Sequence, residues 1–374
     1  MIAKILINLI AFVLFAYIFL FKMIKKNDTN YITVLIIQAL GILISLLQTS
    51  ISIFNMIIFK ILVYFNCIIF PVSIFFIENR GINYPELLSV FMAKLYLIKN
   101  NNKKAKEILI KLVTKYKDSY YGHKMLAEIY SKEGGMRKAI DEYVKVLDIK
   151  GNDYQSYFKI SKLLDELGKK NEAIQMLQTL VNKKPELYEA TKLLGHLLIE
   201  NEKYKEAINA YNKFLKYQEK KEIYFALGNA YIMTNDFTSA KKSLEKVTEF
   251  DNRAYEAYYL LGQISLLYRD FDMAESFFLQ SIYESFEAKG YYQLAKISII
   301  KNNISKAILY LNKAIQNDGR LYKIVMEEPI FITLKNKIEK PNEMVEGKVE
   351  ENKVEKHLDE VYELTKTMKK TKRK

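Results

Sequence analysis

The chain has 374 residues, enough for two or three domains, and a formal net charge of +14 from 57 basic and 43 acidic residues. Acidic residues are interleaved with the basic ones after residue 80, which argues against nucleic-acid binding. The single cysteine excludes a disulfide framework within the chain, and the three histidines lie far apart, so we expect no metal, no cofactor and three surface histidines: His123, His196 and His357.

Residues 1–80 are predicted to form a membrane anchor, because charge is sparse there and dense afterwards. Residues 5–21 are uncharged and, as a helix, would span about 25 Å, close to the thickness of a bilayer's hydrocarbon core. A signal peptide is the rival interpretation, but no small-x-small cleavage site follows. Between residues 31 and 77 only Lys60 is charged. One helix there would be about 70 Å long, so two crossings joined near Gln48-Thr49-Ser50 are predicted.

The anchor is therefore predicted to have three spans, at about 5–21, 31–47 and 53–77, with a tilt or kink at Pro71. Two spans plus a re-entrant or interfacial segment are the alternative. With three spans, the flanks after the first and the last lie on the same side, and both are basic. The positive-inside rule then predicts a multi-pass plasma-membrane protein with an external N-terminus and its remaining domains in the cytoplasm. The basic residues of the two flanks are Lys22, Lys25, Lys26, Arg80, Lys94 and Lys99.

A repeat of 33 or 34 residues follows the anchor. A small residue recurs at Ala93, Ala127, Ser161, Gly195, Gly228, Gly262 and Ala295. Twelve residues after each comes an alanine: Ala105, Ala139, Ala173, Ala207, Ala240, Ala274 and Ala307. Four residues further on is a large apolar residue: Leu109, Tyr143, Leu177, Tyr211, Leu244, Phe278 and Leu311. The spacing predicts antiparallel helix pairs whose small residues lie where the two helices cross.

This pattern resembles the tetratricopeptide-repeat (TPR) family, most closely in LLGHLLIENEKYKEAINAY and ALGNAYIMTNDFTSAKKSL. The resemblance implies an all-α protein with a TPR α-solenoid of about seven repeats over residues 84–321. It also implies protein–protein binding on a concave surface lined by the first helix of each repeat. The family's terminal proline is present only as Pro185.

Two segments follow the repeats. Residues 322–340 are predicted to form a capping helix that covers the last apolar face of the solenoid. Residues 341–374 are predicted to be a charged amphipathic tail, with apolar residues at heptad spacing: Val354, Leu358, Val361, Thr365 and Met368. A solvated, partly disordered tail is one interpretation. The other is a helix that docks into the apolar groove, self-associates, or lays its basic end on anionic lipid.

The positions that line the concave surface in TPR proteins become apolar in the last three repeats. These residues are predicted to form a groove for a partner's peptide or helix. The alternative is that they join inter-repeat packing, or that the capping helix fills the groove. The candidate residues are Phe225, Asn229, Ile232, Met233, Tyr259, Gln263, Leu266, Tyr292, Lys296 and Ile299.

No catalytic motif accompanies the repeats. A Gly-rich phosphate loop, HExxH and a nucleophile elbow are all missing from the sequence, so no enzyme activity is predicted. The predicted function is a membrane-anchored TPR scaffold that binds proteins and assembles complexes on the cytoplasmic face, with the lipid bilayer as the partner of its spans. The alternative is an accessory subunit of a transport, secretion or envelope-biogenesis complex whose activity lies in a partner.

Overall fold

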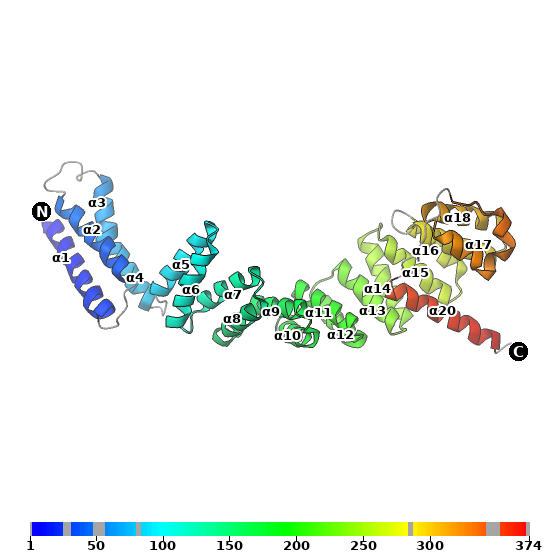
Figure 1. Cartoon of the computed structure of the whole chain (residues 1–374), viewed down its shortest axis with the longest axis horizontal. Coiled ribbons are helices and arrows are strands. Elements are labelled where there is room, and N and C mark those ends of the chain that lie inside the picture. The colour runs from blue at the N-terminus through cyan, green and yellow to red at the C-terminus, as the bar shows by residue number, and fades with distance from the viewer. Residues whose placement is uncertain are drawn as a thin grey trace. The chain divides into compact units, whose positions relative to one another are not determined.

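A computed structural model describes residues 2–24, 31–47, 57–79, 84–282, 287–341 and 352–371. These residues form helices joined by short turns, and no strand occurs among them (Figure 1). The chain divides into two compact units, Met1–Leu163 and Leu164–Lys374.

The first unit begins with apolar helices that contact one another: α1 with α2, and α2 with α3. In the middle of this bundle the buried Gln38 side chain donates a hydrogen bond to the Ala11 carbonyl, over 2.9 Å. A methyl group on Gly41 would lie 2.8 Å from Asn66 Cβ, so α2 and the following helix approach closely there. The elements are α1 (Ile2–Tyr17), η1 (Ile18–Ile24), α2 (Ile32–Leu47), α3 (Ile57–Tyr64), η4 (Phe65–Ile69) and α4 (Phe70–Asn79).

The last of these helices runs through α3, η4 and α4 without a break, and η4 is a π-helical segment that ends two residues before Pro71. Proline has no backbone N–H and crowds the carbonyl four residues earlier, so a widened turn accommodates it. Among the described residues, one helix, Ile57–Ile74, is long and apolar enough to cross a membrane, and the apolar helices Asn8–Phe21 and Ile32–Leu47 are shorter. The structure therefore supplies one candidate span where the sequence predicts three. The predicted turn at residues 48–50 and the start of the third span lie outside the described residues.

Seven helical hairpins follow, each made of a first helix, called helix A here, and a second, helix B. Their spacing repeats the period of the sequence. In chain order they are α5 (Tyr84–Ile98) with α6 (Asn102–Lys115), α7 (Tyr120–Lys132) with α8 (Met136–Ile149), α9 (Tyr154–Glu166) with α10 (Lys170–Lys183), α11 (Tyr188–Glu200) with α12 (Tyr204–Leu215), α13 (Lys221–Met233) with α14 (Phe237–Phe250), α15 (Tyr255–Leu267) with α16 (Phe271–Ser281), and α17 (Glu287–Ile300) with α18 (Ile304–Asn317).

The small residues of the repeat lie where the sequence predicts, at the contact between helices A and B. All seven repeat alanines of helix B are fully buried. In three hairpins the glycine of helix A faces the large apolar side chain of helix B. An added Cβ would overlap the Tyr211 ring at Gly195, and would lie 2.7 Å from the Phe278 ring at Gly262. The glycines therefore give these rings the space they occupy.

The turn from helix A to helix B has the same backbone in every hairpin. One residue per turn has a positive φ: Asn100, Gly134, Gly168, Glu202, Asn235, Arg269 and Asn302. The following N–H donates to a carbonyl five residues earlier, as in Asp270 N to Ser265 O over 3.0 Å. This is the hydrogen bond that closes a helix C-terminus. Only two of the seven residues are glycine, so the turn geometry is maintained mainly by backbone bonding.

The segment after the last hairpin differs from the single capping helix predicted over 322–340. Helix α19 (Leu321–Glu327) ends before Pro329, and η6 (Pro329–Lys337) is a 3-10 helix. Proline disfavours the α conformation in the preceding residue, and Glu328 is extended. Both elements bury apolar side chains against α17 and α18, namely Leu321, Val325, Phe331 and Leu334.

Candidate functional site

The last described helix, α20 (Lys353–Thr371), lies against α13 and α15, helices A of the fifth and sixth hairpins (Figure 1). It reaches α17, helix A of the seventh, through an ion pair between Glu355 and Lys289. We call this face of α13, α15 and α17 the C-terminal groove. Leu358 of α20 is only 1% exposed and belongs to the same apolar cluster as Ile232 and Leu260, against which Val354 also packs. Tyr362 packs on a neighbouring cluster that contains Leu266. Residues four apart on α20 thus form one apolar ridge.

An ion pair between a buried carboxylate and a half-buried lysine accompanies this ridge. Glu355 is 2% exposed, and its carboxylate accepts a hydrogen bond from Lys289 Nζ of α17 over 2.7 Å. Glu256 of α15 lies nearby. Burial, and then the negative charge of Glu355, raise the pKa of Glu256, while Lys289 opposes the shift. The groove therefore holds two carboxylates close to one lysine.

Further polar contacts fix α20 along the groove. Lys353 pairs with Glu202 over 2.8 Å, in the turn of the fourth hairpin. His357 Nε2 lies 3.0 Å from the Asn235 side-chain oxygen, and Gln263 Nε2 donates weakly to Asp359 over 3.4 Å. Together with the Lys289–Glu355 pair, these contacts run from the fourth hairpin to the seventh, so α20 crosses several repeats.

The sequence-predicted groove residues fall into three groups. Four of them lie in or against the apolar clusters that receive α20: Phe225, Ile232, Tyr259 and Leu266. Gln263 is buried and meets α20 through Asp359, while the buried side-chain oxygen of Asn229 has no hydrogen-bond partner among the described residues. Met233 is half-buried.

The third group is engaged by the segment after the repeats. Tyr292 donates a hydrogen bond to Glu328, Lys296 forms an ion pair with the same carboxylate over 3.2 Å, and Ile299 packs on the cluster built around Phe331. Ile232 is fully buried and Ile299 belongs to this packing, so both side chains contribute to the apolar core.

Sequence reasoning missed Lys289, Glu256 and Glu328, because none lies at a position that the family resemblance assigns to the groove. Between α15, α17, α20 and the start of η6 remains a cavity of about 450 Å³. Its lining includes Gln263, Leu266, Lys296, Leu358 and Tyr362.

The comparisons with known proteins agree on the repeat. Models of the tetratricopeptide repeat match residues 155–186, 192–248 and 288–320. The chain is a tetratricopeptide-repeat protein. Among solved structures, this TPR protein is similar to the C-terminal part of a TPR repeat-containing protein from Cytophaga hutchinsonii, with a TM-score of 0.52 and 18% identity over 62% of this chain and 95% of that one. It is also similar to YrrB, described as a TPR protein with an unusual peptide-binding site, with a TM-score of 0.43 and 20% identity over 52% and 97% of the two chains. No curated protein matches the sequence.

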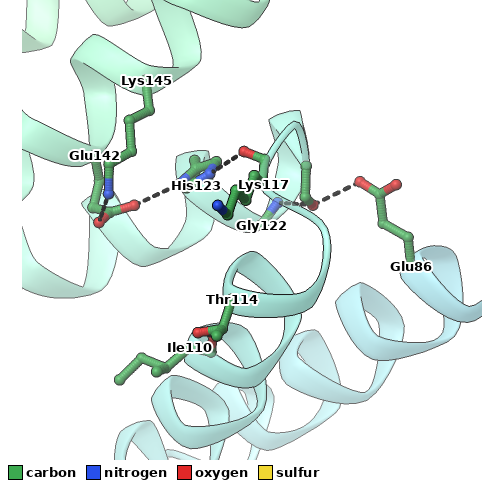
Figure 2. A network of polar contacts seen from close by, with 9 residues as sticks. Glu86, Ile110, Thr114, Lys117, Gly122, His123, Glu142 and Lys145 are labelled. Atoms are coloured by element: carbon green, nitrogen blue, oxygen red, sulfur yellow. Dashed lines mark hydrogen bonds and ion pairs between the residues drawn. The ribbon is translucent and has the colours of Figure 1, made fainter.

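The first unit of the TPR protein contains a buried histidine, which the sequence predicts at the surface. His123 is 3% exposed, and its ring nitrogens lie 2.5 Å from Glu142 Oε2 and 2.8 Å from the Lys117 carbonyl (Figure 2). Lys145 also pairs with Glu142. A single histidine in a repeat gives no sequence signal that distinguishes this buried place from an exposed one. The prediction of a surface residue was therefore wrong for His123, whereas the His196 side chain is exposed.

A second polar cluster in this unit surrounds Asp153, before helix α9. Tyr120 and Lys124 donate to its carboxylate over 2.6 and 2.9 Å. Burial acts to raise the pKa of Asp153, but these two hydrogen bonds and the charge of Lys124 outweigh it and hold the pKa below its usual value. Both clusters consist of paired groups and join helices. Among the described residues, no group of three histidine, cysteine or acidic side chains could hold a metal ion.

Proposed function

We propose that this chain is a membrane-anchored TPR scaffold whose C-terminal groove binds an amphipathic helix of a partner protein. A role in protein–protein interaction follows from the TPR repeats, and the anchor and the groove are the proposal. The observation that carries the groove is α20 itself. Its apolar ridge and its acidic Glu355 already lie against α13, α15 and α17. A face that accepts one amphipathic helix has the shape and chemistry to accept another.

The membrane anchor is supported by the surface of the N-terminal helices. Large apolar side chains point outward from α1, α2 and α3, including Phe12, Leu43 and Ile57. Lys60 is the only charged side chain that the structure describes between residues 6 and 76. Only 22% of the candidate span Ile57–Ile74 is buried, whereas the core helix of a soluble protein would be mostly buried. An apolar surface of this kind is stable in a bilayer.

Helix α5, which directly follows this region, supports the same proposal. Leu87, Phe91, Leu95 and Ile98 are exposed on it and lie three or four residues apart, so they form one apolar stripe. Lysines accompany the stripe at 94 and 99. An apolar stripe with lysines beside it is typical of a helix at the surface of an anionic membrane.

Membrane insertion is tested by extraction. We expect the full chain to stay in the membrane pellet at alkaline carbonate pH and to be released by detergent. A reporter fused after Lys374 is expected to resist external protease in intact cells, because the positive-inside rule predicts cytoplasmic repeats from the basic flanks. Release by carbonate would refute the anchor, and cleavage of the reporter in intact cells would refute the orientation.

Partner binding at the groove is tested by site-specific photocrosslinking in the native membrane. Ile300 is 40% exposed and lines the groove cavity, so a photoreactive residue there is expected to capture a partner. Leu309 on α18 is 51% exposed and lies outside the groove, and it serves as the matched control. A partner captured equally from both positions, or from neither, would refute the groove as the binding site.

A further inference from the structure

Helix α20 fills its site incompletely. A cavity of about 450 Å³ remains beside Leu358 and Tyr362. Gln263 lines this cavity and is only 3% exposed, and its buried side-chain oxygen has no hydrogen-bond partner among the described residues. A buried acceptor without a donor destabilises the state that buries it. The site therefore offers apolar volume and an acceptor that α20 does not use.

At the contact between α20 and the groove, positive and negative charges are unequal in number. One half-buried lysine, Lys289, faces the buried carboxylate of Glu355, and the carboxylate of Glu256 lies close to both. Attraction to the lysine specifies an acidic residue on the bound helix, while repulsion from Glu256 weakens it. The same face therefore selects the chemistry of the helix and limits how tightly α20 is held.

We propose that α20 is an internal substitute for the partner's helix, which blocks the C-terminal groove until a helix of the same chemistry displaces it. That partner helix carries apolar residues at three successive positions four apart, as at Val354, Leu358 and Tyr362. It has an acidic residue directly after the first of them, as at Glu355. It also presents a hydrogen-bond donor to the Gln263 oxygen. This inference rests on the proposed function, that the groove binds a partner protein.

Two other occupants are less well supported. A second copy of the chain would bring an identical α20 and would leave the Gln263 oxygen unpaired in the same way. The basic end of α20 would suit an anionic lipid surface, but the ridge centred on Leu358 is buried against protein, and the groove supplies a lysine for an acidic side chain.

The experiment adds a fluorescent peptide of residues 352–371 to the purified full chain. We expect it to bind a Leu358→Lys chain at least about tenfold more tightly than wild type, because the tethered α20 of the wild type competes at high local concentration. Glu360 is exposed on the same helix, so Glu360→Lys is the matched control and should behave as wild type. Leu358→Ala, a milder change, should give an intermediate affinity.

A charge swap tests the chemistry of the site. In the Leu358→Lys chain, Lys289→Glu is expected to weaken binding of the peptide about tenfold. A peptide that carries Glu355→Lys is expected to restore the affinity. A purely structural role for Lys289 would not produce this restoration, since the peptide change would then leave the loss in place.

Two results would overturn the proposal. One is equal peptide affinity for wild type and Leu358→Lys. The other is no binding to either Leu358 variant when circular dichroism shows that both retain native helix content. Photocrosslinking from Ile300 in the Leu358→Lys chain separates this failure from that of the proposed function. Capture of a partner without peptide binding would refute only the role of α20, whereas the absence of any capture refutes the groove as well.

Discussion

Replacing the glycine of helix A by alanine should destabilise the protein in the fourth hairpin and have a smaller effect in the fifth. At Gly195 an added Cβ would overlap the hydroxyl and ring carbons of Tyr211, which is buried and cannot move into solvent. At Gly228 the Cβ would lie 3.0 Å from the end of the Leu244 side chain, which can rotate. The two glycines occupy the same position of successive repeats, so they differ mainly in what they face.

The expected magnitudes follow from two opposing effects. Alanine stabilises a helix by about 1 kcal/mol relative to glycine, and this gain is the same at both positions. Overpacking a core destabilises by about 1–3 kcal/mol, occasionally more, and the overlap with several atoms of one ring belongs at the upper end. We therefore expect Gly195→Ala to lower the free energy of unfolding by about 2 kcal/mol and Gly228→Ala to change it by about 1 kcal/mol or less.

Denaturant unfolding of the full chain in one detergent, followed by circular dichroism, measures both variants. Tyr211→Leu in the Gly195→Ala background should recover much of the loss, because leucine is the residue that faces Gly228 in the next hairpin. Equal stability of the two glycine variants would refute the reasoning. So would a double variant that is no more stable than Gly195→Ala.

Three further outcomes are expected. Docking of α20 should strengthen as pH falls from neutral through the raised pKa of Glu256, because above that pKa the Glu256 carboxylate is charged and repels Glu355. Protection of the α20 amides from hydrogen exchange, corrected for the intrinsic exchange rate, should therefore rise as pH falls. Glu256→Gln should remove this pH dependence. Asp153→Asn should lower the thermal unfolding temperature at pH 7. This difference from wild type should shrink as pH falls through the lowered pKa of Asp153, because the charged carboxylate then no longer stabilises the wild type. Arg269→Gly should raise the free energy of unfolding and Gly134→Ala should lower it, each by roughly 1 kcal/mol, since both residues have a positive φ. Denaturant unfolding measures both changes, and changes of the same sign would contradict this.

The repeat could be predicted from sequence because its determinants are local. A small residue, an alanine twelve positions later and a large apolar residue four positions after that all lie within one hairpin. Gly195 meets Tyr211 as this spacing requires, and Ala207 is fully buried. The break in the cap was also present in the sequence, as Pro329, but an apolar pattern around it favoured a continuous helix.

The site was less predictable because its determinants are distant in sequence. Tyr292 and Lys296 occupy groove positions of the repeat, yet both bind Glu328 of the following segment. Lys289 acquires its role only from Glu355, sixty-six residues away. Position within a repeat predicts which face a side chain occupies. It does not predict which other segment reaches that side chain first.

The shared backbone of the seven turns has a consequence for how such an array can lengthen. Because the bend between helices A and B depends on a main-chain hydrogen bond and a positive φ that Glu202 and Arg269 also adopt, a duplicated hairpin can change nearly all its surface residues and still fold in place. Growth is restricted where α20 crosses the array, from the fourth hairpin to the seventh. A hairpin inserted between α15 and α17 would move Lys289 away from the position where α20 meets Leu260, so the length of the array there is matched to the length of its own tail.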